Sequence, residues 1–138
     1  ENERISSGLK SEVVSAPLQA ITGRYSAIRQ DEDGTLLLLD GHDECPLSMA
    51  STGTREQVFL ALRIGFASLL MKGEKGVLIL DDAFQHSDWQ RRNHCVQELL
   101  NLVSAGWQVF YFTMDDHIRD LFVDASQRLG DRFKKVDL

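Results

Sequence analysis

Two adjacent carboxylates, Asp81 and Asp82, follow a short apolar run in this 138-residue sequence. Residues 77–80 read Val-Leu-Ile-Leu without alternation, which predicts a parallel strand covered on both faces. Carboxylate oxygens are ligands that suit Mg²⁺, and the strand ends of open α/β sheets are where ligands bind. The pair therefore indicates a site that handles a metal ion or water. The alternative is that the two acids only cap the following turn.

A run of small polar residues at 50–57, Ala-Ser-Thr-Gly-Thr-Arg-Glu-Gln, precedes a long apolar-rich stretch. Thr54 followed by Gln57 fits a capping box, so we expect a helix to begin near Gly53 or Thr54. With Ser51, the first amides would form a helix N-terminus, which carries about half a positive charge and suits a phosphate group. Plain helix capping is the alternative.

Polar side chains also mark two later junctions. Ser87 and Asp88 precede a helix predicted from Arg91, and Asp88 could cap that helix. His117 follows the predicted strand at 107–112. An imidazole at that place could donate to a phosphate oxygen, or His117 merely opens the next helix.

The elements that must position these residues follow from hydrophobic periodicity and turn signals. Helices are expected over 2–16, 54–72, 91–104 and 118–125, and strands over 24–29, 35–39, 77–80, 107–112 and 132–136. Pro17 ends the first helix or breaks it. The Asp-Gly pair at 33–34 predicts a β-hairpin. Residues 77–112 form a strand-helix-strand unit, which predicts parallel strands joined by a right-handed crossover.

Bulk composition narrows the class of protein. A net charge of -6 with both signs interspersed argues against a globally basic nucleic-acid binder, although a local basic patch stays open. Cys45 and Cys95 are too far apart for a CxxC pattern, so reduced thiols are expected. The sequence has no apolar run near 18 residues and no signal-peptide layout, which predicts a soluble intracellular protein without a membrane partner. The opening ENERISSGLK, without a start methionine, reads as a piece of a longer protein.

The order of these motifs resembles the C-terminal lobe of ABC-type ATPase heads. It is closest to the chromosome-maintenance (SMC) and double-strand-break-repair branch, whose heads end long coiled coils. The resemblance covers roughly residues 18–136. It implies an α/β fold, a partial P-loop NTPase lobe with a mostly parallel sheet flanked by helices, an N-terminal β-hairpin and a coiled-coil stub. Residues 1–17 would end the coiled coil, and residues 18–138 would form the C-terminal ATPase lobe.

The resemblance also assigns roles to residues. Asp81 would end the Walker B strand and help hold Mg²⁺, while Asp82 replaces the usual glutamate that acts on the attacking water. Residues 50–57 match the signature motif, with Ala50 in place of its leucine. The implied nucleotide-binding residues are those of the signature and of the D-loop: Ser51, Thr52, Gly53, Thr54, Gln57 and Asp88.

The switch region departs most from the family pattern. Met114 stands where the commonest pattern has a histidine, and His117 follows three residues later. The resemblance therefore makes His117 the candidate switch histidine, grouped with Asp82 as a candidate catalytic residue.

The sequence contains no GxxxxGK[ST] loop to cradle phosphates. In the family this loop lies in the N-terminal lobe, so the resemblance implies that this chain alone is an inactive half of an ATPase head. Joined to its N-terminal lobe, it would bind Mg²⁺ and ATP and hydrolyse ATP on dimerisation with a second head. The implied full-length protein acts on DNA, lies in the cytoplasm with the nucleoid, and has a nuclease subunit as a further candidate partner.

Two other functions fit parts of the sequence. In the first, Asp81, Asp82, Asp115 and Asp116 crowd neighbouring strand ends and form a metal-dependent phosphoesterase or nuclease. In the second, the motifs serve dimerisation without catalysis, for which the departures at Asp82 and Met114 leave room.

Overall fold

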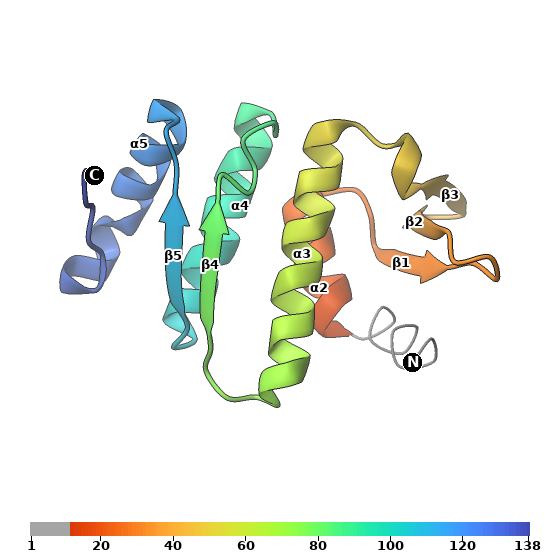
Figure 1. Ribbon diagram of the computed structural model, residues 1–138, viewed down its shortest axis with the longest axis horizontal. Helices are drawn as coiled ribbons and strands as arrows, with labels where there is room; N and C mark the ends of the chain where they lie inside the picture. The colour runs from red at the N-terminus through yellow and green to blue at the C-terminus, as the bar shows by residue number, and fades with distance from the viewer. Residues whose placement is uncertain (1–11) are drawn as a thin grey trace.

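The computed structural model describes residues 12–138. In chain order its elements are α2 (Glu12–Thr22), β1 (Ala27–Gln30), β2 (Leu36–Asp40), β3 (Asp43–Pro46), η1 (Leu47–Met49), α3 (Thr52–Met71), β4 (Val77–Asp81), α4 (Trp89–Ser104), β5 (Gln108–Phe112), α5 (Asp116–Ala125) and η2 (Ser126–Arg132). Figure 1 shows a small sheet of β1–β3 at one end of the molecule and α5 at the other. Between them lie α2, α3, α4 and the β4–β5 pair.

The predicted strand-helix-strand unit is present. Strands β4 and β5 pair in parallel from Val77 opposite Gln108 to Asp81 opposite Phe112, and α4 connects them. The remaining strands form a separate antiparallel sheet. A mostly parallel sheet was expected, and the structure instead has a two-stranded parallel sheet and a three-stranded antiparallel one.

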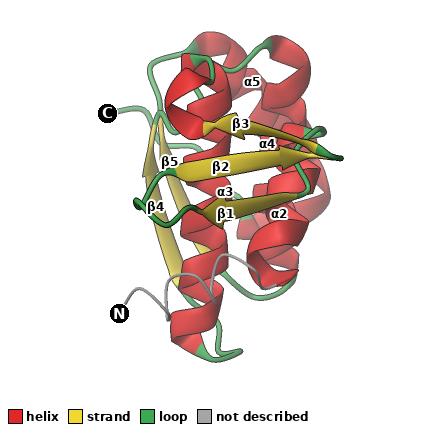
Figure 2. Ribbon diagram, turned by 90° about the vertical axis from the view of Figure 1, so that its right-hand side faces the viewer, coloured by secondary structure: helices red, strands yellow, loops and turns green. Residues whose placement is uncertain are grey.

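The predicted N-terminal hairpin is confirmed and gains a third strand. Ala27 lies opposite Leu39 in β2, and β2 also pairs with β3. Figure 2 shows β2 between its two neighbours. The turn closes through a 2.8 Å bond from the Asp31 amide to the Thr35 carbonyl, and Gly34 takes the positive φ of 89° that favours glycine.

Helix α2 runs through Pro17 and ends at Thr22, so the predicted end or break at Pro17 is wrong. Proline removes one backbone hydrogen bond, but burial of Val14, Leu18 and neighbouring side chains against α3 holds the helix together. A Cβ at Gly65 of α3 would come within 2.5 Å of Val14, so glycine permits this close approach. The boundary at residue 17 falls inside α2, and the predicted helix over 2–11 lies outside the described residues.

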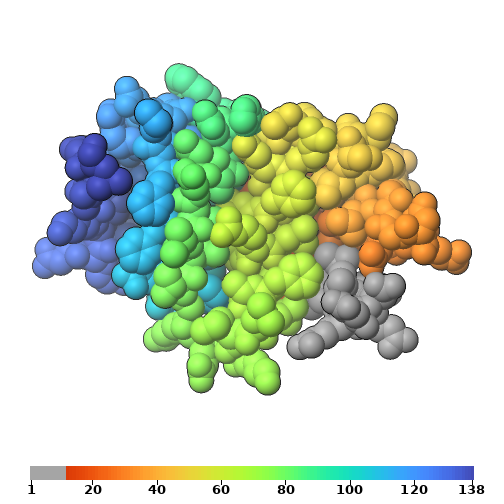
Figure 3. Space-filling model, in the orientation of Figure 1, coloured from red at the N-terminus to blue at the C-terminus, as the bar shows by residue number. Residues whose placement is uncertain are grey.

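The β4–β5 sheet is covered on one face only, so the prediction of burial on both faces is wrong. Leu78 and Leu80 are buried beneath the helices. Val77 and Ile79, on the opposite face, each keep 58% of their surface exposed. Figure 3 shows β4 and β5 uncovered on this side, where Phe110 and Phe112 of β5 are also exposed. An unbroken apolar run thus predicted a covering layer that residues 12–138 do not supply.

The strand predicted over 132–136 is also wrong. Helix η2 continues to Arg132, and residues 133–138 have no regular structure. Phe133 has extended dihedral angles, but its amide bonds to the Gly130 carbonyl over 3.2 Å instead of to a strand. Within the described residues, 133–138 pair with no strand. Among the described helices, none has the length and apolar character needed to cross a membrane.

Candidate functional site

The two predicted acids lie at the carboxyl end of β4. Asp81 is the last strand residue and is exposed. Asp82 adopts a left-handed backbone with φ of 46°, and its amide donates to the Phe112 carbonyl over 2.9 Å. This conformation is uncommon for residues other than glycine and is found at turns and functional sites. The turn ends the strand sharply and gives the two neighbouring carboxylates different surroundings.

One oxygen of the Asp82 carboxylate, Oδ1, is buried and has no hydrogen-bond partner among the described residues 12–138. Leaving a buried polar group unpaired costs about 1–3 kcal/mol, more if charged, so such groups are rare and often functional. The oxygen can accept a proton from a water molecule held at this edge. Mg²⁺ in nucleotide sites takes one or two carboxylates together with waters and phosphates. The chemistry of the Asp81 and Asp82 carboxylates therefore fits a Mg-nucleotide, and Asp81 is the more exposed of the two.

Helix α3 begins at Thr52 with Ser51 as its N-cap, one or two residues earlier than predicted. The Ser51 hydroxyl accepts the Thr54 amide over 3.2 Å and donates to the Thr54 hydroxyl over 2.9 Å. The proposed capping box from Thr54 to Gln57 is therefore wrong, because serine is the better-placed cap. The amides of Thr52 and Gly53 belong to the first turn, whose N–H groups lack intrahelical acceptors.

Gln57 serves a different purpose from the expected cap. Its side chain is buried, and its Nε2 donates to the Ser87 hydroxyl over 3.1 Å. On the same helix, the Glu56 carboxylate accepts the His86 amide over 2.6 Å and contacts His86 Nδ1 at 2.8 Å. A Cβ at Gly53 would lie 2.5 Å from the His86 carbonyl oxygen. The first two turns of α3 are thus fastened to the segment between β4 and α4.

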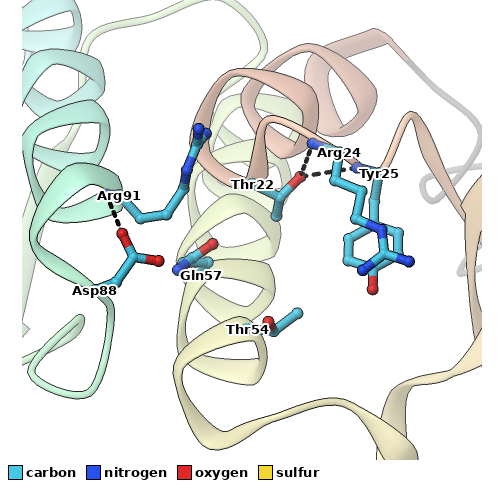
Figure 4. A pocket seen from close by; sticks show the side chains of 7 residues that line it. All are labelled: Thr22, Arg24, Tyr25, Thr54, Gln57, Asp88 and Arg91. Carbon is cyan, nitrogen blue, oxygen red and sulfur yellow. Dashed lines mark hydrogen bonds between the residues drawn. The ribbon is translucent and has the colours of Figure 1, made fainter.

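Asp88 caps α4, as predicted. Its Oδ1 accepts the Arg91 amide over 2.8 Å. Figure 4 shows Arg91 extending from α4 towards the end of α2, where it packs on Gly23. An open polar depression of about 160 Å³ lies between these elements, lined by Thr22, Arg24, Tyr25, Thr54, Gln57, Asp88 and Arg91. The structure therefore brings two predicted nucleotide-binding regions, the signature and the D-loop, to one depression.

The switch region forms the N-terminus of α5. Asp115 is its N-cap and accepts the amides of His117 and Ile118 over 2.9 and 3.1 Å. The Ile118 amide, and after it the charge of Arg92, holds the pKa of Asp115 below its usual value. The His117 ring stacks on Trp89, with ring centroids 3.9 Å apart. Met114, by contrast, is 96% exposed.

Asp115 therefore has structural partners of its own. Its Oδ2 lies 3.1 Å from Arg92 Nη2 while its Oδ1 caps α5. It is not available to share an ion with Asp81 and Asp82. Within residues 12–138, no group of three or more acidic, histidine or cysteine side chains could jointly hold a metal ion. No observation therefore favours the predicted nuclease alternative.

Arg92 was missed by the sequence analysis. It is buried in the first turn of α4 and contacts the backbone at Ser87 and the ring of His117. A signal was present, since Arg92, Val96 and Leu99 follow the spacing of a helix face turned to the core. A charged residue in such a stripe must be paired when buried.

The predicted residues gather along the edge of the molecule where strands β4 and β5 end. Figure 1 shows the carboxyl ends of β4 and β5 beside the beginnings of α3, α4 and α5. A chain of hydrogen bonds runs along the acid side, from the Asp82 carbonyl through the Gln85 backbone and Arg92 to His117. The signature residues reach the same segment through Ser87.

The chain as a whole resembles a solved structure at the level of fold. A solved structure from work on ATP-driven dimerization and DNA stimulated activation of SMC ATPases superposes with a TM-score of 0.56. The match covers 99% of each chain at 18% sequence identity. This chain therefore has the fold of an SMC-type ABC ATPase lobe, which confirms the predicted resemblance.

One curated relative is similar in sequence. The chain is 36% identical over 72 residues to the uncharacterized protein YhaN of Bacillus subtilis (strain 168). The match covers 52% of this chain and 8% of that much longer protein. No protein-family model matches the sequence.

Proposed function

We propose that this chain is the C-terminal half of an ATP-binding and ATP-hydrolysing head in a DNA-repair or chromosome-maintenance ATPase. The observation that carries the proposal is the acid pair at the end of β4, with a buried and unpartnered Asp82 oxygen, within the fold of an SMC-type lobe. Phosphoryl transfer depends mostly on positioning and charge stabilisation. A carboxylate at a strand end with an unpaired oxygen supports that kind of chemistry.

On the acid side, Asp81 helps to hold Mg²⁺ and Asp82 acts on the attacking water. Bound Mg²⁺ neutralises charge on the transferred phosphoryl group. The exposed position of Asp81 and the unpaired Oδ1 of Asp82 support this division of roles. Asp82 is one methylene shorter than glutamate, but its left-handed backbone displaces the side chain from the strand direction. His117 acts beside them as the switch histidine.

On the signature side, the N-terminus of α3 completes the nucleotide site of a second head. Its N–H groups and partial positive charge suit a terminal phosphate, and Ser51 and Thr52 are exposed there. Gly53, Thr54 and Gln57 belong to the signature turn. The hydrogen bond from Gln57 to Ser87 connects this turn to the D-loop at Asp88. Dimerisation of heads would therefore place the phosphate of one copy against the signature of the other.

The partner within the same head is the N-terminal lobe. Four apolar side chains on the open face of the β4–β5 sheet support such a partner: Val77, Ile79, Phe110 and Phe112. A contiguous exposed apolar patch marks an interaction surface. The N-terminal lobe would also bring the phosphate-binding loop that this sequence lacks.

We propose DNA as a partner of the complete ATPase, and the work on DNA stimulated activation of SMC ATPases, from which the similar structure comes, supports this proposal. The proposal includes a homodimer of heads, a place in the cytoplasm with the nucleoid, and no membrane partner. A nuclease subunit stays a prediction from the family resemblance. The coiled-coil role of residues 1–17 also stays a prediction.

The test is to measure Mg²⁺-dependent ATP hydrolysis by this chain alone and after it is joined to its N-terminal lobe. The chain alone should show no turnover, and the joined head should hydrolyse ATP at a rate that rises with head concentration and with added DNA. Turnover by the chain alone, or a joined head that binds no nucleotide, would overturn the proposal. Nucleotide-dependent dimerisation without hydrolysis would favour the non-catalytic alternative.

A further inference from the structure

Arg92 is a buried arginine in the first turn of α4, with 7% of its surface exposed. Its Nε donates to the Ser87 carbonyl over 3.1 Å, and its Nη2 donates to the Gln85 carbonyl. Both carbonyls belong to the segment that connects the acid pair to α4. One side of the guanidinium therefore fixes the backbone that follows Asp82.

The other side of the same guanidinium binds the loop after β5. Nη1 lies 3.1 Å from Nδ1 of His117, and Nη2 lies 3.1 Å from Oδ2 of Asp115. A guanidinium can serve both loops because it carries five N–H donors in a rigid fork. A lysine ammonium, a compact charge on a flexible stem, has no such fork. Arg92 is thus a bridge between the segment after β4 and the loop after β5.

The bridge also determines which nitrogen of His117 carries the proton. A guanidinium has donors and no acceptor, so Nδ1 of His117 must accept the bond from Arg92. The proton of the neutral ring then lies on Nε2. Trp89 stacks on the ring with an interplanar angle of 17°, which fixes the plane of the imidazole. Both the tautomer and the orientation of His117 are therefore set by the first turn of α4.

We propose that Arg92 is a positioning residue that holds His117 as an Nε2–H donor and ties it to the segment following Asp82. The inference rests on the proposed function for the group that receives this donor, a phosphate oxygen of the nucleotide. Because Gln57 bonds to Ser87 in the same segment, Arg92 also connects the signature helix to His117. A shift of the signature helix on dimerisation would reach the histidine through this side chain, beside the stacked ring of Trp89.

The first test does not depend on ATP. The imidazole ¹⁵N shifts of His117 are measured in this chain, in Arg92→Met and Arg92→Lys, and in Arg128→Met, the same change at an exposed arginine on η2. Wild type and Arg128→Met should show Nδ1 unprotonated and Nε2 protonated. Arg92→Met should show exchange between the two tautomers, with Arg92→Lys intermediate. An unchanged His117 tautomer in both Arg92 variants would overturn the proposal, and if Arg92→Met fails to fold, Arg92→Lys decides.

The second test uses the joined head. Arg92→Met should lower kcat by about 10- to 100-fold with little change in KM, because a misplaced group costs transition-state stabilisation and not nucleotide binding. Arg92→Lys should recover part of the rate, and Arg128→Met should behave as wild type. Equal rates in Arg92→Met and Arg128→Met would contradict the proposal. A wild-type head without turnover would instead remove the proposed function, and the tautomer measurement would still decide the role of Arg92.

Discussion

The signature turn at 51–57 and the acid pair at 81–82 both lie at the edge of the molecule where β4 and β5 end. They differ in whether their polar groups find hydrogen-bond partners within the chain. The signature turn is complete within the chain, since the Ser51 side chain caps the helix and Gln57 is bonded to Ser87. The acid pair leaves a buried Asp82 oxygen without a partner. Folding alone provides hydrogen-bond partners for the signature turn, whereas the acid pair keeps an oxygen that a ligand or water can use. Changes at the first should therefore alter stability as well as function, and changes at the second should alter activity with little loss of stability.

The largest expected effect is on the acid side. Asp82→Asn in the joined head should lower kcat by about 100-fold or more, because a general base contributes 10²–10⁴-fold. The free energy of unfolding of this chain with Asp82→Asn should equal that of wild type or exceed it by up to about 2 kcal/mol. The variant removes a buried unpaired charge, and asparagine tolerates the left-handed backbone. Urea unfolding and steady-state kinetics measure the two quantities. A variant that loses stability and keeps its turnover would reverse the comparison.

A second change should strike the signature turn through packing. Gly53→Ala should lower the free energy of unfolding by about 1–3 kcal/mol, because the added methyl group overpacks the contact with the His86 carbonyl. In an open helix the same change would stabilise by about 0.5–1 kcal/mol. Thr52→Ala, at the exposed neighbour, is the control and should stay within about 0.5 kcal/mol of wild type. A stabilised Gly53→Ala variant would mean that α3 is not fastened to the D-loop segment.

A smaller effect is expected at the cap itself. Ser51→Ala removes the side-chain acceptor for the Thr54 amide and should cost about 1 kcal/mol of folding stability. Ser51→Asp keeps an acceptor and should restore most of the loss in this chain. In the joined head, however, the added negative charge should oppose a phosphate and weaken nucleotide-dependent dimerisation. Equal dimerisation by Ser51→Asp and wild type would break the link between the cap and phosphate binding.

Asp115 provides the matched carboxylate at the end of the neighbouring strand. Its folded-state pKa lies below the unfolded value, mainly through the Ile118 amide and also through Arg92. Its contribution to stability is therefore complete above the ordinary aspartate pKa of about 3.9 and is lost as pH falls through the lower folded value. Asp115→Asn should flatten the acid side of the plot of unfolding free energy against pH. Identical acid slopes in wild type and Asp115→Asn would contradict this assignment.

Local signals in the sequence predicted much of the site. The cap at Asp88, the acids at the end of β4 and the hairpin at Gly34 depend on neighbours within a few residues, and all three are present. The failed predictions depend on distant partners. The segment 132–136 pairs with no strand among the described residues, and burial of both faces of 77–80 needed a layer that residues 12–138 do not provide.

Arg92, whose role the sequence did not indicate, also depends on partners that are distant along the chain. Its contacts, Ser87 and His117, lie 5 and 25 residues away along the chain. Only the fold brings these three together, so sequence spacing could place the arginine on a buried helix face but not identify its partners. The start of α3 was misplaced for a related reason, because Gln57 is drawn to Ser87 across the core and is not free to form a capping box.

The central claim is that the acids of one head and the signature of another act on the same ATP, and mixing two inactive heads tests it most directly. A joined head with Asp82→Asn and one with Ser51→Arg should each be nearly inactive as homodimers. In the mixed dimer, one site combines an intact acid pair with an intact signature. In an equal mixture about half of the dimers are mixed, and each of these has one intact site of two. Mixing should therefore restore about a quarter of wild-type turnover if the two sites of the symmetric dimer work independently. A mixture that stays as inactive as its components would contradict the account.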